Sequence, residues 1–246
     1  MTTNVYDSLA GMMSSDSRWS CQFGKYLIYI DDARFEKIEK YQNSVFMFAG
    51  DGTKIQAWKD WIRTSPKSNV GIPDCEKICI CIADQAKNSV LFMERQDIVK
   101  DGGYFAGSGS RYAYQCWGQN KDPLKAVETA KVFDVSSGGD VKFFEFGSGK
   151  HNLFSPIGKD VRIEDVSKAM ATRGNVMEIT VNSATNSPPF KLADMAANDA
   201  SLLDVQNKIT SGQLSPTAPC DGMYSEWTAG QLDKLNSALG KVFDWD

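Results

Sequence analysis

Residue 2 of the chain is a threonine directly after the initiator methionine, and this position can supply a self-contained nucleophile. Once Met1 is removed, Thr2 carries both a hydroxyl and a free α-amine. An unperturbed α-amine has a pKa of roughly 7.7–8.0, so it can accept the proton of the hydroxyl. The chain has one histidine, His151, in a stretch rich in Gly, Ser and Lys, so a hydrolase built on this sequence would find its base elsewhere. Many proteins begin Met-Thr by chance, so this prediction depends on later segments.

The segments that would position Thr2 read as short strands and amphipathic helices. Residues 3–6 and 11–15 flank a turn and predict a β-hairpin. Apolar residues at 55, 58, 61 and 62 recur at helical spacing, and Pro123 takes the first position of another predicted helix. We expect further strands at 26–30, 44–50, 77–83, 89–94, 104–106 and 141–146, and helices at 110–118 and 123–133. This order favours two packed sheets with helices outside them.

The character of the chain changes after Gly147, where Gly-Ser-Gly-Lys forms a loose junction. The remaining residues are more polar and predict helices near 163–171, 198–211 and 228–243 and a strand at 175–181. The proline-rich stretches 187–189 and 215–219 are typical of loops. We therefore expect a core domain at 1–147 and an extension of unknown role at 148–246.

Five short motifs in the first part of the chain resemble those of a known family. They are Thr2-Thr3, Asp16-Ser17-Arg18, Lys37 ahead of Phe48-Ala49-Gly50, Gly107-Ser108-Gly109, and Asp134-x-x-Ser137-Gly138-Gly139. Their order and their positions at element junctions resemble the proteasome β-subunits and their bacterial relative HslV, which are N-terminal-nucleophile (Ntn) hydrolases, and most of all the small bacterial proteasome homologues. The resemblance implies an α+β fold, a four-layer αββα sandwich. The short stretch between Gly50 and Gly107 implies one thinned helical layer, followed by a mixed α/β extension.

The resemblance also implies a role for each motif. Thr2 Oγ would be the nucleophile and its α-amine the base, while the Lys37 charge would keep that amine unprotonated. Asp16 would pair with Lys37, because a buried ammonium without a partner is costly. The N–H of Gly50 would donate to the oxyanion. A wall of hydrogen-bonding groups would orient the amine, made by Ser108, Asp134 and Ser137. Lys40 is a rival to Lys37, which we prefer for its distance to Gly50.

A substrate pocket is expected beside Thr2. By position in the family, its lining would be Trp19, Phe35, Glu39, Phe48 and Gln56. The aromatic residues favour a small apolar side chain of the substrate, whereas Glu39 favours a basic one, and both preferences stay open. Packing in the core is an equally good interpretation of Phe35 and Phe48.

Composition excludes several classes of function. The chain of 246 residues is 42% hydrophobic and 24% charged with a net charge of −4, and it has no long Lys/Arg run, which argues against general nucleic-acid binding. No apolar run reaches membrane-spanning length, and we find neither a signal peptide nor a metal motif, so we expect a cytoplasmic protein without cofactor. The six cysteines are not expected to form disulfides, and Cys79 and Cys81, which share one face of a predicted strand, are expected as small buried side chains.

The function favoured by these motifs is a threonine-type amide hydrolase, a proteasome-like peptidase that acts on peptides or proteins as a homo-oligomer. An unfoldase or another protein could be its partner. Two alternatives remain. One is a binding or immunity-type protein on an inactive Ntn scaffold, and the other is an acylase that cleaves a small amide.

Overall fold

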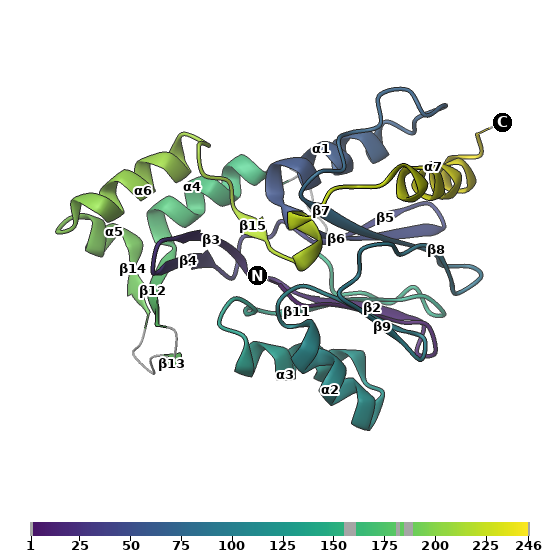
Figure 1. The fold of residues 1–246 in the computed structure, drawn as a ribbon, viewed down its shortest axis with the longest axis horizontal. Coiled ribbons are helices and arrows are strands. Elements are labelled where there is room, and N and C mark those ends of the chain that lie inside the picture. The colour runs from purple at the N-terminus through teal and green to yellow at the C-terminus, as the bar shows by residue number, and fades with distance from the viewer. Residues whose placement is uncertain (1, 155–160, 181–182, 185–188, 246) are drawn as a thin grey trace.

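The structure is a computed structural model that describes residues 2–154, 161–180, 183–184 and 189–245, and two β-sheets lie at its centre (Figure 1). The smaller sheet has the strand order β11 (Val141–Glu145), β2 (Met12–Asp16), β1 (Asn4–Asp7), β10 (Gly103–Ala106) and β9 (Ile98–Lys100). The larger sheet runs β13 (Ser183–Ala184), β12 (Asn175–Thr180), β4 (Tyr26–Ile30), β3 (Trp19–Phe23), β15 (Thr217–Ala218), β6 (Ser44–Asp51), β7 (Ile78–Asp84) and β8 (Ser89–Phe92). Two further strands join it, β14 (Phe190–Lys191) on β12 and β5 (Ile38–Tyr41) on β6.

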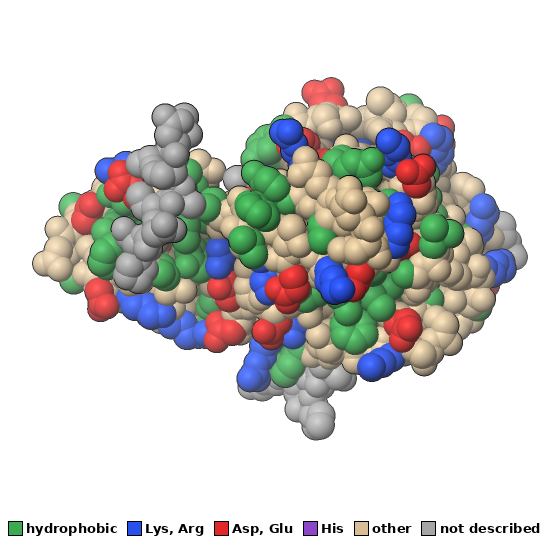
Figure 2. All heavy atoms as spheres, turned by 90° about the horizontal axis from the view of Figure 1, so that it is seen from below, with side chains coloured by type: hydrophobic (Ala, Val, Ile, Leu, Met, Phe, Trp, Pro, Cys, Tyr) green, Lys and Arg blue, Asp and Glu red, His purple; other side chains and the backbone are tan. Residues whose placement is uncertain are grey.

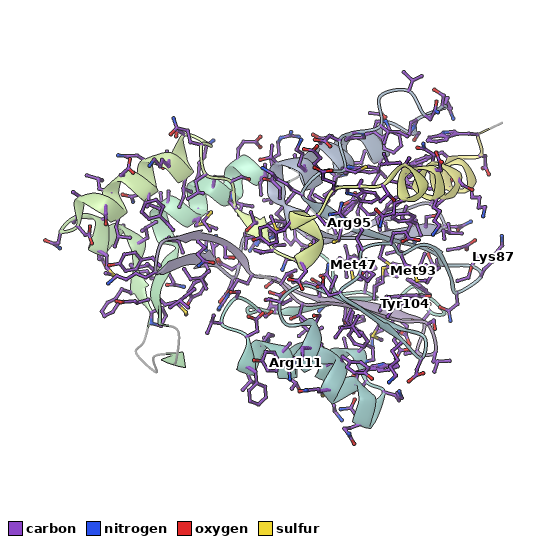
Figure 3. The ribbon with its side chains drawn as sticks, viewed as in Figure 1. Met47, Lys87, Met93, Arg95, Tyr104 and Arg111 are labelled. Carbon is purple, nitrogen blue, oxygen red and sulfur yellow. The ribbon has the colours of Figure 1, made fainter. Side chains whose placement is uncertain are left out.

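Strand β6 shows why the apolar run at 44–50 is buried on both faces. Successive side chains of a strand point to opposite sides. Val45 and Met47 join a cluster between the two sheets, whereas Phe46 and Phe48 join the core on the other face of the larger sheet. Figure 3 shows Met47 in the space between the sheets, near the labelled Tyr104. The two sheets therefore pack face to face.

Helices cover the outer faces of both sheets. Helices α2 (Ser110–Asn120) and α3 (Pro123–Phe133) pack on the smaller sheet, with Val5, Phe105 and Trp117 in the shared core. Helix α1 (Gly52–Arg63) lies over the larger sheet beside α7 (Ala229–Phe243), where the rings of Trp61 and Phe243 lie 5.3 Å apart. The end of that sheet formed by β3, β4 and β12 is covered by α4 (Ile163–Arg173), α5 (Leu192–Ala196) and α6 (Ala200–Thr210).

The predicted hairpin is confirmed, with Asn4 opposite Ser15, and so is each helix expected from periodicity. The helix starts follow the expected chemistry, because Asp51 and Asp122 accept hydrogen bonds from the first turns of α1 and α3. The stretch 215–219 differs from the prediction of a loop, since it contains strand β15. Strands β3, β5, β9, β13 and β14 and the short helix α5 were not predicted. Of the other proline-rich stretch, residues 187 and 188 lie outside the described residues.

The C-terminal part contributes to the same core as the N-terminal part. One hydrophobic cluster contains Trp19 and Phe48 together with Leu202, Leu239 and Phe243. On the face in Figure 2, basic and acidic side chains are interspersed among the described residues. None of the helices in the described ranges is both long and apolar enough to cross a membrane.

Candidate active site

The β1–β2 hairpin brings Thr2 and Asp16 together. Because Asn4 pairs with Ser15, the residues just outside this pair also face each other, and the Asp16 N–H donates to the Thr3 carbonyl at 3.1 Å. The Asp16 carboxylate turns toward the chain start, where Oδ1 accepts from Thr2 Oγ1 at 2.5 Å and from the Thr3 N–H at 2.8 Å. The two arms of one hairpin thus place a hydroxyl against a carboxylate.

Lys37 completes this group from the other sheet. It directly precedes strand β5, and its Nζ donates to Thr2 Oγ1 at 2.6 Å and to Asp16 Oδ1 at 2.9 Å. A third bond, also 2.9 Å, runs to the Asp16 carbonyl. Thr2, Asp16 and Lys37 expose 0%, 1% and 2% of their surfaces, so the group is shielded from water. The rival Lys40 is exposed and lies over the Phe144 ring instead.

Burial and charge act against each other in this ion pair. Burial alone would raise the pKa of Asp16, but the Lys37 charge and the hydrogen bonds from Thr2, Lys37 and Thr3 outweigh it and hold that pKa below its usual value. Burial lowers the pKa of Lys37, and the Asp16 charge offsets this only in part. Asp16 is therefore an anion at neutral pH, and Lys37 gives up its proton more readily than a lysine in water.

A second polar group, from the smaller sheet's helices, adjoins the first. Asp134 follows α3, and its Oδ2 accepts from Ser108 Oγ at 2.5 Å and from Ser137 Oγ at 2.6 Å. Ser137 also shares a 2.7 Å hydrogen bond with Thr3 Oγ1. Thr3 therefore links the two groups. Its residue type alone did not indicate this contact with Ser137. The Gly138 N–H, which donates to Asp16 Oδ2 at 3.0 Å, is a second link.

Glycines allow the loop 107–109 to approach the chain start. Gly107 has a φ of +98°, and a Cβ placed there would lie 1.9 Å from the Thr2 carbonyl oxygen. A Cβ on Gly109 would lie 1.9 Å from Thr3 Oγ1. The Gly109 N–H donates to the Thr2 carbonyl at 3.3 Å. Only a residue without a side chain fits at these positions.

Gly50 ends the buried part of β6, between β15 and β7. It pairs with Ile78 on one side and Ala218 on the other. Its φ is +119°, and a Cβ would lie 2.1 Å from the Lys77 carbonyl oxygen. Strand β6 is tied to the hairpin of Thr2 by Asn4 Nδ2, which donates to the Phe48 carbonyl at 2.8 Å. The role of Gly50 as an oxyanion donor stays a prediction.

The five residues predicted to line a substrate pocket lie apart from the cavity that adjoins Ser108. Trp19, Phe35 and Phe48 are buried in the core under the outer helices. Gln56 donates to Asp60 and accepts from the Ile163 N–H. Glu39 pairs with Lys59 at 3.2 Å and with Arg63 at 2.8 Å. Their role in substrate binding stays a prediction.

A cavity of about 240 Å³ lies beside Ser108. Its lining combines polar residues of β3 and of the loop after α3 with the segment around β15: Ser20, Cys21, Gln22, Leu27, Ser108, Ser136, Leu214, Ser215, Thr217, Pro219, Cys220, Asp221, Met223 and Tyr224. The hydroxyl of Ser136 is buried without a hydrogen-bond partner among the described residues. The sequence did not indicate the part of this lining that comes from residues 214–224, since these residues are distant along the chain from every motif.

Comparison with solved structures finds similarity to proteasome-like proteins. A bacterial proteasome homologue (BPH) of Thiobacillus denitrificans in complex with epoxomicin matches with 18% identity and a TM-score of 0.38, over 63% of this chain and 99% of that chain. The BPH of the same organism in another structure matches with 17% identity and a TM-score of 0.36, over 74% of this chain and 99% of that chain. The eukaryotic HslV of Trypanosoma brucei matches with 13% identity and a TM-score of 0.30, over 58% of this chain and 99% of that chain. No family model matches the sequence, and no curated protein does. At TM-scores of this size the similarity assigns no function, so the proposal below depends on the contacts around Thr2.

Proposed function

We propose that the protein is a threonine-type Ntn amide hydrolase, a proteasome-like peptidase with Thr2 as its nucleophile. One observation carries this proposal. The hydroxyl of Thr2 lies 2.6 Å from the Lys37 ammonium and 2.5 Å from the Asp16 carboxylate, in a place that excludes water. A buried hydroxyl with both a cation and an anion at hydrogen-bond distance is suited to losing its proton.

The proposed reaction begins with removal of Met1, which frees the α-amine of Thr2. The Lys37 charge disfavours protonation of that amine, which then takes the proton of Thr2 Oγ. The oxygen attacks the substrate carbonyl, and the Gly50 N–H would stabilise the oxyanion. The proton passes to the leaving amine as the C–N bond breaks, and water then hydrolyses the ester on Thr2.

The second polar group has a positioning role in this proposal. Ser108 and Ser137 both donate to Asp134, and Ser137 also contacts Thr3, the residue after the nucleophile. This chain of bonds supports a fixed orientation of the Thr2 amine. In the same proposal the fold is an αββα sandwich, residues 148–246 form an extension on the core, and the protein acts as a homo-oligomer.

The experiment is an intact-mass measurement of untagged protein, followed by reaction with epoxomicin as a threonine-directed electrophile. We expect loss of the Met1 mass and a single adduct that maps to Thr2. The Thr2→Ala variant should give no adduct. If Met-free wild type reacts no better than Thr2→Ala, the proposal is refuted. Short peptides and acyl amides offered side by side then distinguish a peptidase from an acylase.

A second candidate is a binding protein on an inactive Ntn scaffold. The observation that favours it is the complete burial of Thr2, at 0% exposure, because a nucleophile must meet its substrate. Retention of Met1 in cells together with a stoichiometric protein complex would support this candidate.

A further inference from the structure

The segment 215–220 fills a slot in the larger sheet. Strands β3 and β6 are not paired with each other, because β15 lies between them and is antiparallel to both. Thr217 stands opposite Ser20 on one side and Asp51 on the other, and Ala218 stands opposite Gly50. Neighbouring strands lie about 4.8 Å apart, so without β15 the gap would be one strand wide and open to another extended peptide.

The sequence of the segment explains why this strand has only two residues. Pro216 and Pro219 flank the pair, and proline has no N–H to donate to a ladder. A proline also favours extended backbone in the residue before it, here Ser215 and Ala218. The sequence of the segment therefore favours an extended conformation with few hydrogen bonds to the neighbouring strands. A strand held by so few bonds can be replaced by another extended peptide.

The slot borders a cavity whose wall includes Ser108 of the candidate active site. Ala218 stands opposite Gly50, the proposed oxyanion donor, and the cavity beside Ser108 has Thr217, Pro219 and Cys220 in its wall. Thr2 is completely buried in this arrangement. A peptide substrate could reach Gly50 along β6 only where β15 now lies.

We propose that residues 215–220 are an internal pseudosubstrate, which occupies the peptide-binding slot between β3 and β6 and must leave before a substrate strand can pair there. This inference rests on the proposed function, because it describes the regulation of the same site. The occupant in the structure is the chain's own segment, and the competing ligand is an extended peptide.

Contacts on both sides of the segment fasten it in place. Before the strand, the Pro216 carbonyl accepts from the Gly52 N–H at 3.0 Å, and Ser215 Oγ lies 2.9 Å from Thr53 Oγ1. After it, Cys220 Sγ lies 3.1 Å from Cys79 Sγ on β7. Farther on, Arg95, labelled in Figure 3, donates to the carbonyl of Ser225 at 2.6 Å. Release of the strand thus requires these flanking contacts to stretch or break.

The first test offers the segment back in trans. The test variant weakens the strand by four glycine replacements: Pro216→Gly, Thr217→Gly, Ala218→Gly and Pro219→Gly. The control variant carries four glycine replacements in an exposed loop: Lys67→Gly, Ser68→Gly, Asn69→Gly and Val70→Gly. The probe is a fluorescent synthetic peptide of residues 213–222 with serine in place of cysteine, and its anisotropy reports binding. We expect the test variant to bind this peptide at least tenfold more tightly than wild type or the control variant does. The test variant should also bind it at least tenfold more tightly than it binds a peptide of scrambled sequence. Equal binding by test and control variants would overturn the proposal.

Hydrogen exchange on the unmodified protein gives a second measurement that needs no variant. The amides of Thr217 and Ala218 should exchange at least a hundredfold faster than those of β7, which pairs with the other side of β6. Protection of β15 equal to that of β7 would show a fixed strand and overturn the proposal.

Epoxomicin labelling separates this inference from the proposed function. Both hold if the test variant is labelled several-fold faster than wild type and the control. Equal, measurable rates in all three proteins would leave the nucleophile in place and refute the pseudosubstrate. Peptide binding by the test variant without any labelling would refute the hydrolase and keep the slot.

Discussion

Replacement of Lys37 by methionine tests the ion pair on which the proposed site is built. Methionine has a similar length and no charge, so the change removes the ammonium while it fills the same space. Asp16 then keeps the hydrogen bonds from Thr2, Thr3, Arg18 and Gly138 but loses its only ionic partner among the described residues. The carboxylate stays inside the protein at 1% exposure, without a countercharge.

The size of the effect follows from that burial. Removal of one partner from a buried ion pair costs about 3–5 kcal/mol, because the remaining charge is uncompensated. The side chains of Lys37 and Asp16 are 1% and 0% exposed, so solvent screening does not reduce this value. For a chain of 246 residues, a loss of this size lowers the Tm by about 6–20 °C. The double variant Lys37→Met with Asp16→Asn removes both charges and should recover most of the loss.

The assay is urea unfolding at several pH values. In the wild type the pKa of Asp16 is lowered, so its stabilising contribution is present above about pH 4 and is lost as the pH falls through the folded-state value. In Lys37→Met the Lys37 charge no longer opposes burial, so we expect the pKa of Asp16 to be higher than in the wild type and the variant to gain stability relative to wild type as the pH falls. The difference in unfolding free energy between wild type and Lys37→Met should therefore be largest near pH 7 and become smaller toward pH 4. A loss below about 1 kcal/mol at pH 7 would refute a buried pair.

Three further outcomes follow from the site. Thr2→Ser keeps a hydroxyl and an amine and should retain epoxomicin labelling, as intact mass would show. Thr2→Ala should lose the labelling, and calorimetry should show a folded protein whose Tm is lowered by the loss of the hydrogen bonds that Thr2 Oγ1 makes with Asp16 and Lys37. Gly107→Ala places a Cβ against the Thr2 carbonyl at a φ of +98° and should cost about 1–3 kcal/mol of unfolding free energy and most of the labelling, while the control Gly147→Ala, which has open space, should change neither. Burial raises the pKa of Asp97 to about 6, with a further rise from Asp221, so the contribution of Asp97 to wild-type stability should fall by about 2 kcal/mol between pH 4 and pH 6. The difference in unfolding free energy between wild type and Asp97→Asn, measured across this pH range, should show this fall.

Much of the fold could be predicted because local sequence carried the information. The turn between residues 3–6 and 11–15 indicated the hairpin, and that hairpin sets Thr2 against Asp16. The choice of Lys37 over Lys40 came from the resemblance, because the distance from Lys37 to Gly50 is nearer that of the family, and the structure places Lys37 Nζ 2.6 Å from Thr2 Oγ1. The start of α3 at Pro123 was equally local.

Strand β15 could not be predicted, since nothing local marks it as a strand. Two residues between prolines have no periodicity, and the segment becomes a strand only because β3 and β6 leave a gap that it fills. The lining of the cavity beside Ser108 could not be predicted either. Leu214 and Tyr224 reach this cavity only through tertiary packing, which local sequence does not show. Thr3 is a different case: its contact with Ser137 spans 134 residues and depends on how the hairpin meets the end of α3.

The arrangement around Thr2 is expensive as a structural device. A buried ion pair contributes little or no net stability compared with apolar side chains of the same volume, so Asp16 and Lys37 are poorly explained as a means of holding the two sheets together. Gly107 adds backbone with positive φ against the Thr2 carbonyl, where an ordinary residue would not fit. Costly features of this kind gather where a protein binds or reacts. Their concentration on one hydroxyl favours a chemical role for Thr2 over a scaffold that has no use for it.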